Sequence, residues 1–362
     1  MSILAKEQIP IRFLTTEFIW EPDFPKAPFA EYFFFPKSTY LCKQFSLNQK
    51  IRRILRAVEY LHDIRRLKKL VKQFSPSIVH FNWSRLPSLD YTLIRFLKTL
   101  GIEVIYTAHN FLPHDTSKKY VQQFQRIYEE VDKIVTLTSY VKNCLVTEIG
   151  ISANKIKIIP HPNFLPLLDA YHLEPPRRSK KLKTIIFYGQ IHPYKGLDVL
   201  INACPLIFSE IPECILKICG NPYEDFSKYD KQIHQLKLPP EKVQKHLYYL
   251  STEESINQLL SSDIVVLPYK RSSQSGVIPL ATSLGIPVVG SAVGGIPEMI
   301  QEGVNGSLVP ANDSVALAHK IINLLKDYQA LEALKTNARF ASEKIFPTEV
   351  IREKFLTLYK NC

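Results

Sequence analysis

The segment Phe187-Tyr188-Gly189-Gln190-Ile191-His192-Pro193-Tyr194-Lys195-Gly196-Leu197-Asp198, called the first motif below, joins the end of an apolar strand to a loop and the start of a helix. Gly189 closes the predicted strand, and a residue without a Cβ lets the backbone approach a ligand closely. Lys195 can place a positive charge on a phosphate bound there. Taken alone, the segment fits an ordinary turn with a surface lysine equally well.

Two more segments place loops at the ends of strands. The second motif runs from Leu267 to Leu280, with the polar residues Ser272-Ser273-Gln274-Ser275 before a helix that begins near Gly276. Free N–H groups at a helix start bind anions, although a serine cap would explain the same pattern. The third motif, Gly294-Gly295-Ile296-Pro297-Glu298, predicts a tight backbone before a helix start, and by itself it is structural.

From about residue 77, short apolar runs alternate with amphipathic segments. Such alternation predicts parallel sheets covered by helices on both faces. Ser139 is expected to cap the helix that follows the third of these strands. The predicted strands are 77–81, 103–107, 133–138, 156–159, 184–188, 215–219, 247–250, 264–267, 288–290 and 307–309. The first 76 residues are less regular, with expected strands at 11–15 and 32–35.

A proline-rich and basic stretch divides the alternation into two halves. It contains Pro175-Pro176 and the run Arg177-Arg178-Ser179-Lys180-Lys181. We therefore expect an N-terminal domain over 1–165, a linker over 166–182 and a C-terminal domain over 183–343. A terminal helix within 344–362 is expected to pack back toward the N-terminal domain.

A long helix is predicted over residues 51–74, with apolar residues mostly three or four apart. Its other positions carry many basic residues, which fits either a core helix with a solvated basic face or contact with anionic lipid. The apolar positions are Ile51, Ile54, Leu55, Val58, Leu61, Ile64, Leu67, Leu70, Val71 and Phe74. The basic positions are Arg52, Arg53, Arg56, Arg65, Arg66, Lys68, Lys69 and Lys72.

The charge of the chain is uneven. The 362 residues include 46 Lys and Arg against 34 Asp and Glu, a net charge of +12. Residues 1–180 carry 27 basic and 16 acidic side chains, so the excess lies almost entirely in this half. A basic half suggests an anionic partner, which includes a membrane surface, a phosphorylated acceptor or nucleic acid. No nucleic-acid recognition module is visible, and no nucleic acid is expected as a partner.

Cysteine usage and hydropathy favour a reducing, cytoplasmic location. None of the six cysteines forms a C-x-x-C pair, and several lie in apolar runs where a small buried hydrophobe is expected. The start of the chain shows no signal peptide, and no stretch approaches the ~18 apolar residues of a membrane helix. Any membrane contact is therefore expected to be peripheral, at the inner face of the membrane.

The order, spacing and flanks of the three motifs together resemble glycosyltransferase family 4 and its relatives with the GT-B fold. The family's Gly-x-Pro-Val-Val and Gly-Gly-x-Pro-Glu segments match Gly285-Ile286-Pro287-Val288-Val289 and the third motif. The family's diphosphate loop matches Gly189-Gln190 through Lys195-Gly196, except at Gln190. The resemblance covers about residues 77–340. It implies an α/β GT-B fold, with two Rossmann-like doubly wound domains that face a central cleft.

One departure from the family concerns its paired glutamates. The family usually has two Glu with seven residues between them around the second motif's glycine. Alignment on Gly276 puts Ser273 and Ala281 at these positions, and alignment on Gly285 puts Ser272 and Leu280 there. The chain is more similar to a branch with Ser-Gly before an Ala-containing helix. Hydroxyl groups of the donor must then meet other groups, such as Gln274 and backbone amides.

The resemblance also assigns roles in the N-terminal half. A strand ends in Thr107-Ala108, and in the family a His after it lies near the sugar and acceptor, which makes His109 the catalytic candidate. Asn110, His114 and Asp115 are acceptor-side candidates. Histidine titrates near neutral pH and suits proton transfer, although a structural loop histidine is the alternative.

These observations predict that the protein is a metal-independent hexosyltransferase of oligosaccharide or polysaccharide biosynthesis. The donor is a UDP- or GDP-linked sugar, which is a substrate rather than a cofactor, and the acceptor is a glycan or a lipid-linked molecule. No Asp-x-Asp pair occurs, so we expect no essential metal, and Arg271 is expected to replace the family's missing arginine. The donor-binding candidates are Gly189, Gln190, Lys195, Arg271, Ser273, Gln274, Ser275, Gly276 and Val277. The alternative is a catalytically silent GT-B subunit that binds nucleotide sugar and supports a partner enzyme.

Overall fold

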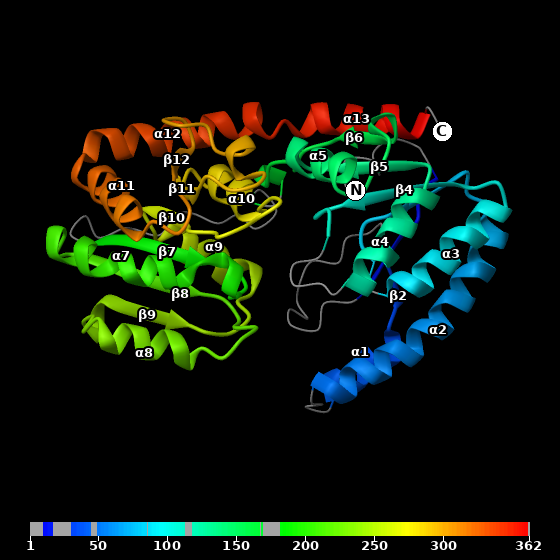
Figure 1. The fold of residues 1–362 in the computed structure, drawn as a ribbon, viewed down its shortest axis with the longest axis horizontal. Helices are drawn as coiled ribbons and strands as arrows, with labels where there is room; N and C mark the ends of the chain where they lie inside the picture. Colours follow the sequence, from blue (N-terminus) through cyan, green and yellow to red (C-terminus); the bar gives the residue numbers. More distant parts are fainter. Residues whose placement is uncertain are drawn as a thin grey trace. The chain divides into compact units, whose positions relative to one another are not determined.

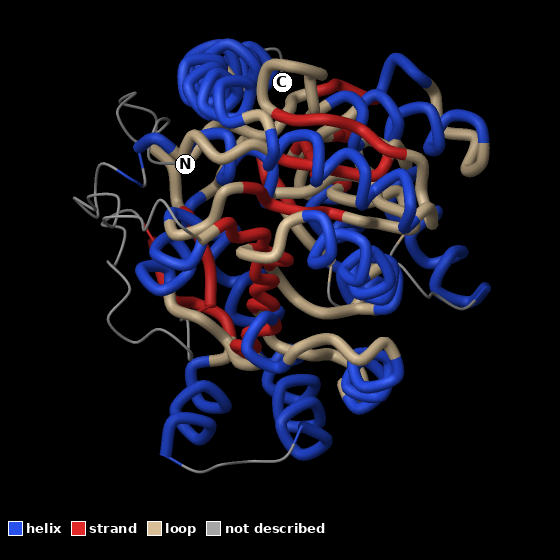
Figure 2. The backbone as a smooth tube through the Cα atoms, turned by 90° about the vertical axis from the view of Figure 1, so that its left-hand side faces the viewer, coloured by secondary structure: helices blue, strands red, loops and turns tan. Residues whose placement is uncertain are grey.

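A computed structural model describes residues 10–16, 30–44, 49–84, 86–112, 118–166, 168 and 182–360. The architecture is α/β, with two main parallel sheets flanked by helices (Figures 1 and 2). Contacts divide the chain into two compact units. Unit 1 comprises Met1–Thr107, Leu112–Val135 and Arg352–Cys362, and unit 2 comprises Ala108–Phe111 and Thr136–Ile351.

The first main sheet has four strands in the order β3-β4-β5-β6. Its strands confirm the four predicted before the linker, and β3 pairs with β4 in parallel. The strands are β3 (Ile78–Phe81), β4 (Glu103–Ala108), β5 (Lys133–Thr136) and β6 (Ile156–Ile158), and the helices among them are α3 (Pro87–Thr99), α4 (Lys118–Glu130) and α5 (Ser139–Thr147). The short strands β1 (Phe13–Thr16) and β2 (Ala30–Phe34) form a separate parallel pair.

The second main sheet has six strands in the order β12-β11-β10-β7-β8-β9, and all of its pairings are parallel. The strands are β7 (Lys183–Tyr188), β8 (Cys214–Cys219), β9 (Val243–His246), β10 (Ile264–Leu267), β11 (Val288–Ser291) and β12 (Gly306–Val309). The helices are α7 (Leu197–Glu210), α8 (Ser227–Gln235), α9 (Thr252–Leu260), α10 (Val277–Ser283), α11 (Ser314–Lys326), α12 (Tyr328–Ile345) and α13 (Thr348–Lys360).

Apolar runs without alternation form the central strands of this sheet because both faces are buried. Ile185 and Phe187 of β7 belong to one core cluster with α7 and α11, whereas Ile186 between them belongs to another with α9 and α10. Successive strand residues point to opposite faces. The core therefore lies on both sides of the sheet, as the sequence predicted.

Two details of the sequence prediction are wrong. The strand expected at 247–250 is instead β9, which lies at the sheet edge and has exposed polar residues, Gln244 and Lys245. An edge strand with solvated residues gives no apolar run in the sequence. The cap of α5 is Thr138, whose Oγ1 accepts a hydrogen bond from the Val141 N–H at 3.3 Å, and Ser139 is the first helical residue.

The long helix α2 (Gln49–Phe74) confirms the predicted helix, but its apolar residues are not all in the core. Ile64, Leu67 and Val71 in its second half are buried. Ile54 and Val58 in its first half are each 65% exposed. The core interpretation therefore holds only for the second half of α2. The shorter helix α1 (Pro36–Gln44) precedes it.

The C-terminal end of α13 is held by a histidine of unit 1. His80 on β3 has its Nδ1 2.7 Å from the Tyr359 hydroxyl and its Nε2 2.7 Å from Thr107 Oγ1. Both ring nitrogens of His80 are thus engaged by side chains, which identifies it as a structural residue. Among the helices that the structure describes, none combines the length and apolarity needed to cross a membrane.

Candidate functional site

Glycines bring together the loops that follow β7, β8 and β10 in unit 2. Gly189 and Gly220 have φ of +112° and +143°, a region that L side chains rarely adopt. A Cβ on Gly220 would lie 2.0 Å from the Gly189 carbonyl oxygen. A Cβ on Gly196 would lie 1.9 Å from the Pro268 carbonyl oxygen. Only glycine fits these contacts, so the loops pack backbone against backbone at the carboxyl end of the sheet.

The third motif packs in the same way on the second. A Cβ on Gly294 would lie 1.8 Å from the Ser272 carbonyl oxygen, and one on Gly295 would lie 2.2 Å from that of Ser273. The Gly295 N–H also donates to the Ser272 carbonyl oxygen at 3.2 Å. All three motifs thus belong to one connected set of loops, at the place where open α/β sheets bind ligands.

Lys195 points into this set of loops. Its Nζ lies 3.1 Å from the position of a Cβ on Gly189 and 5.6 Å from the centroid of the Tyr269 ring. Burial lowers the pKa of Lys195 below 10.5, because it removes water from the ammonium group. No described residue accepts a hydrogen bond from this ammonium. A partly desolvated cation beside a glycine backbone is suited to an anionic ligand such as a diphosphate.

The other two predicted groups of the diphosphate site are more exposed. The Gln190 side chain is exposed, and its Nε2 is 3.4 Å from the Tyr223 hydroxyl. Arg271 is also exposed, in the loop that follows β10. Its part in donor binding stays a prediction.

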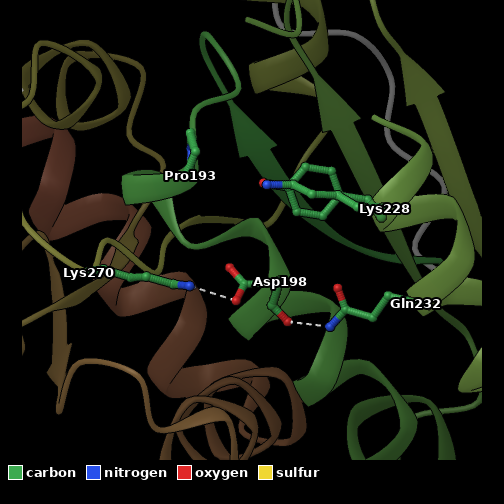
Figure 3. Close-up of a pocket in the computed structure, with 6 residues that line it drawn as sticks. Pro193, Asp198, Lys228, Gln232 and Lys270 are labelled. Atoms are coloured by element: carbon green, nitrogen blue, oxygen red, sulfur yellow. Dashed lines mark hydrogen bonds and ion pairs between the residues drawn. The ribbon is translucent and has the colours of Figure 1, made fainter. Parts of the chain in front are cut away.

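A pocket of about 190 Å³ lies beside the first motif, and Figure 3 shows its lining. The Lys270 ammonium lies 2.7 Å from an Asp198 carboxylate oxygen, and Lys228 is paired with Glu224. Gln232 donates to the Asp198 carbonyl oxygen at 2.8 Å. Because the cations of this pocket already have carboxylate partners, Lys195 is the better candidate for binding a diphosphate. The lining residues are Pro193, Asp198, Lys228, Tyr229, Gln232 and Lys270.

The second motif uses some of its polar groups internally. The Ser275 N–H faces the Met299 sulfur at 3.5 Å, and Ser275 Oγ accepts from the Val277 N–H at 3.3 Å. The contact of the Ser275 amide with a diphosphate therefore stays a prediction, in which a phosphate oxygen would replace the Met299 sulfur as the acceptor. By contrast, Gln274 Oε1 is buried and has no hydrogen-bond partner among the described residues. It can accept a hydrogen bond from a ligand hydroxyl.

Ser273 and Ala281, which alignment on Gly276 predicts to replace the family's glutamates, are both buried. Ser273 is 1% exposed, and its carbonyl oxygen accepts a hydrogen bond from Thr138 Oγ1 at 3.1 Å. Ala281 is fully buried in α10. These small side chains pack within the structure and offer no carboxylate.

Sequence reasoning missed His161, which lies next to the start of α10. Its Nε2 is 3.6 Å from the position of a Cβ on Gly276, and its ring stacks on Phe164. Its Nδ1 is buried without a hydrogen-bond partner among the described residues, and burial lowers the pKa of the ring. Hydrogen bonds of Asn163 to the Phe346 carbonyl oxygen hold this segment. His161 is therefore a well-positioned group beside the second motif.

Glu298 of the third motif has a structural role that the sequence did not specify. Its carboxylate accepts hydrogen bonds from the Ser139 and Tyr140 N–H groups at 2.6 and 2.7 Å. These are unsatisfied donors at the start of α5, where a negative charge is favourable. The third motif thus fixes the N-terminus of α5 through Glu298 and supports the Ser272 and Ser273 carbonyls through its glycines.

Replacing Glu298 with Gln is expected to lower the free energy of unfolding by about 1 kcal/mol, because the helix start loses its charged acceptor. Urea unfolding followed by far-UV circular dichroism measures this change. Glu343→Gln on the exposed side of α12 is the control and should unfold like wild type. An unchanged midpoint for Glu298→Gln would contradict the capping role.

The acceptor-side candidates are only partly placed. His109 and Asn110 follow directly after β4 and are half-buried, within the short segment Ala108–Phe111 that belongs to unit 2. His114 and Asp115 lie outside the described residues. The position of His109 at the carboxyl end of a strand agrees with the sequence prediction, and its catalytic role stays a prediction.

The fold and these loops define a class of protein, the GT-B glycosyltransferases. Residues 28–162 match the family model "Glycosyltransferase Family 4", and residues 172–340 match "Glycosyl transferases group 1". The two matches follow one another and cover most of the chain. The chain therefore belongs to glycosyltransferase family 4.

Known proteins are similar to the chain in sequence or in fold. The chain is 26% identical over 183 residues to N-acetyl-alpha-D-glucosaminyl L-malate synthase of Bacillus anthracis, across 50% of this chain and 46% of that enzyme. It is 32% identical over 148 residues to D-inositol 3-phosphate glycosyltransferase of Corynebacterium glutamicum, across 40% and 35% of the two chains. The crystal structure of Anabaena Alr3699/HepE in complex with UDP has a TM-score of 0.67 at 17% identity and 84% coverage of both chains, which shows the fold.

Proposed function

We propose that the chain transfers a hexose from a UDP- or GDP-linked donor to a glycan or lipid-linked acceptor. The observation that carries the proposal is the partly desolvated Lys195 ammonium beside the Gly189 backbone, within the connected loops of the three motifs. In this proposal Lys195 and Arg271 neutralise the diphosphate. Gln274 accepts a hydrogen bond from a donor hydroxyl, and Gly276 and Val277 leave room for the ligand at the start of α10.

The proposed reaction assigns the remaining candidates to the sugar and the acceptor. His109 acts at the reacting sugar by proton transfer or electrostatic stabilisation, and Asn110, His114 and Asp115 contact the acceptor. Support comes from the Anabaena structure, which is a complex with UDP, a nucleoside diphosphate of the kind proposed here. It also comes from the family match, which covers both halves of the chain.

Thermal unfolding against a panel of nucleoside diphosphates and their sugars tests donor binding. A ligand that binds only the folded state raises its stability by about 2.7 kcal/mol at a hundredfold excess over Kd. We expect UDP or GDP and the matching sugar nucleotide to raise the Tm, and the nucleoside alone to raise it less. A panel in which no nucleotide shifts the Tm would contradict the proposed donor site.

A catalytically silent subunit is the second candidate function. The sequence feature that favours it is Ser273 and Ala281, which alignment on Gly276 places where the family usually has two glutamates. Release of free nucleoside diphosphate from the bound sugar nucleotide distinguishes the two, because slow hydrolysis reports turnover even when the acceptor is unknown. Binding without any release would favour the silent subunit, and release would reject it.

The proposed location is the cytoplasmic face of a membrane, with peripheral contact to anionic lipid. Buried free thiols at Cys144, Cys204, Cys214 and Cys219 are consistent with a reducing compartment. The basic N-terminal half and the lipid-linked class of acceptors support contact with an anionic surface.

Turnover is expected to survive EDTA, because the proposed site neutralises the diphosphate with Lys195 and Arg271 rather than with a carboxylate-bound cation. Among the described residues no cluster of three or more His, Cys, Asp or Glu side chains could hold a metal ion. The measurement compares nucleoside diphosphate release in EDTA with release after added magnesium. Loss in EDTA with recovery in magnesium would overturn metal independence.

A further inference from the structure

The outward face of α2 carries an exposed apolar stripe over its first half. Ile51, Ile54, Val58 and Leu61 are between 46% and 65% exposed. They are spaced by three, four and three residues, which places them on one side of a helix. The buried residues Ile64, Leu67 and Val71 belong to the next turns of the helix and are turned toward the core. The stripe is therefore apolar surface that faces away from the core of unit 1.

The same face continues as a row of cations over the second half of α2. Arg65, Lys69 and Lys72 are exposed and follow Leu61 at spacings of four, four and three. Arg65 and Lys69 form no ion pair with any residue that the structure describes. Lys68 and Lys72 lie over the Phe96 ring of α3, with their Nζ atoms 4.7 and 5.8 Å from its centroid. Figure 1 shows α2 at the edge of unit 1, alongside α3.

Together these residues form what we call the α2 face: Ile51, Ile54, Val58, Leu61, Arg65, Lys69 and Lys72. Its apolar part is about 15 Å long and its cationic part about 10 Å, from a rise of about 1.5 Å per residue. Apolar surface and exposed cations on one side are the two features with which a helix lies on an anionic bilayer.

We propose that the α2 face binds the surface of an anionic lipid bilayer. Ile54, Val58 and Leu61 enter the boundary between headgroups and acyl chains, and Arg65 and Lys69 contact lipid phosphates. A second copy of the chain is a poorer occupant, because its α2 face offers no carboxylate to pair with Arg65 and Lys69. The inference rests on the proposed function, because binding to the bilayer would bring the chain to a lipid-linked acceptor. Its test measures lipid binding alone and needs no nucleotide sugar.

Sedimentation with vesicles tests the proposal on the full chain at 150 mM salt. One set of vesicles is phosphatidylcholine alone, and the other contains about one third phosphatidylglycerol. We expect wild type to bind the anionic vesicles and to bind the neutral ones much more weakly. Nucleotide binding, measured in the same preparation by thermal shift, reports separately on the proposed function.

Two double variants test the two halves of the α2 face. Ile54→Gln with Val58→Gln removes the apolar contribution, and Arg65→Glu with Lys69→Glu reverses two cations. Each basic residue near an anionic surface changes affinity several-fold, so we expect the second variant to bind at least tenfold more weakly. Arg66 is left unchanged because it pairs with the buried Asp63 at 3.0 Å.

Matched control variants make the same kinds of substitution outside α2. Lys344→Glu with Lys354→Glu makes the same change in net charge on α12 and α13, and Val315→Gln with Phe340→Gln removes two exposed apolar residues. Both controls should bind anionic vesicles like wild type. Wild type that ignores anionic vesicles, or α2 variants that bind like the controls, would overturn the proposal. A dimer in solution that the α2 variants abolish would also overturn it in favour of a second copy.

Discussion

His109→Ala is expected to lower turnover by about 10² to 10⁴ while the affinity for nucleoside diphosphate stays nearly unchanged. General acid–base catalysis and electrostatic stabilisation by one side chain have effects of this size. The diphosphate contacts are assigned to the Lys195 loop and the second motif, so removal of His109 should spare them. Nucleoside diphosphate release and calorimetric titration measure the two quantities.

The control for this variant is His319→Ala, which removes an exposed histidine of α11 and should leave both quantities unchanged. Equal turnover in His109→Ala and wild type would make His109 a structural loop residue. A parallel loss of turnover and nucleotide affinity would instead indicate that the loop after β4 affects the donor site as a whole.

Lys195→Ala should weaken nucleoside diphosphate binding by tenfold or more. A charge-assisted hydrogen bond contributes roughly 1.5 to 3 kcal/mol, and the diphosphate would otherwise be buried near fewer cations. Because burial already disfavours the charged form of Lys195, the substitution should not lower the Tm of the empty protein. Lost binding would then report the site rather than unfolding. Lys195→Arg keeps the charge and should recover part of the affinity.

Arg271→Ala is expected to have an effect of the same order, and Gln190→Ala a much smaller one. Both side chains are exposed, so the comparison isolates the charge. Lys231→Ala on α8 serves as the matched control for removal of an exposed cation. If Arg271→Ala binds like wild type, Arg271 faces solvent in the complex and Lys195 provides the main cationic contact.

The buried strands could be predicted from the sequence because parallel sheets with both faces covered consist of continuous apolar residues. The runs around Ile185 and Val265 show this clearly. The edge strand β9 could not be predicted from the sequence, because only Val243 among its residues is buried. In the first half of α2, helical spacing predicted the helix, but spacing alone does not tell whether an apolar face meets the core or the solvent.

The candidate site was predictable where glycines or charge mark a strand end, as at Gly189 and Lys195. The sequence did not show that the Ser275 amide faces Met299 or that Glu298 caps α5, because these contacts join segments 24 and 158 or more residues apart. His161 had a usable signal, since it lies three residues after the end of β6, in a position similar to that of His109 just after β4. Its proximity to Gly276 required the tertiary structure.

The backbone contacts among the glycine loops bear on how the donor preference of such a protein can be redesigned. Gly220 touches Gly189, Gly196 touches Pro268 and Gly294 touches Ser272, so each loop sets the shape of its neighbour. In a chimera that receives only one loop from a relative, that loop would pack against the original backbone of its neighbours. These contacts involve no side chain that could change its rotamer to relieve a clash. Productive loop grafts should therefore transfer residues 189–196, 220–223, 268–276 and 292–298 as one block, and single grafts should yield poorly folded protein.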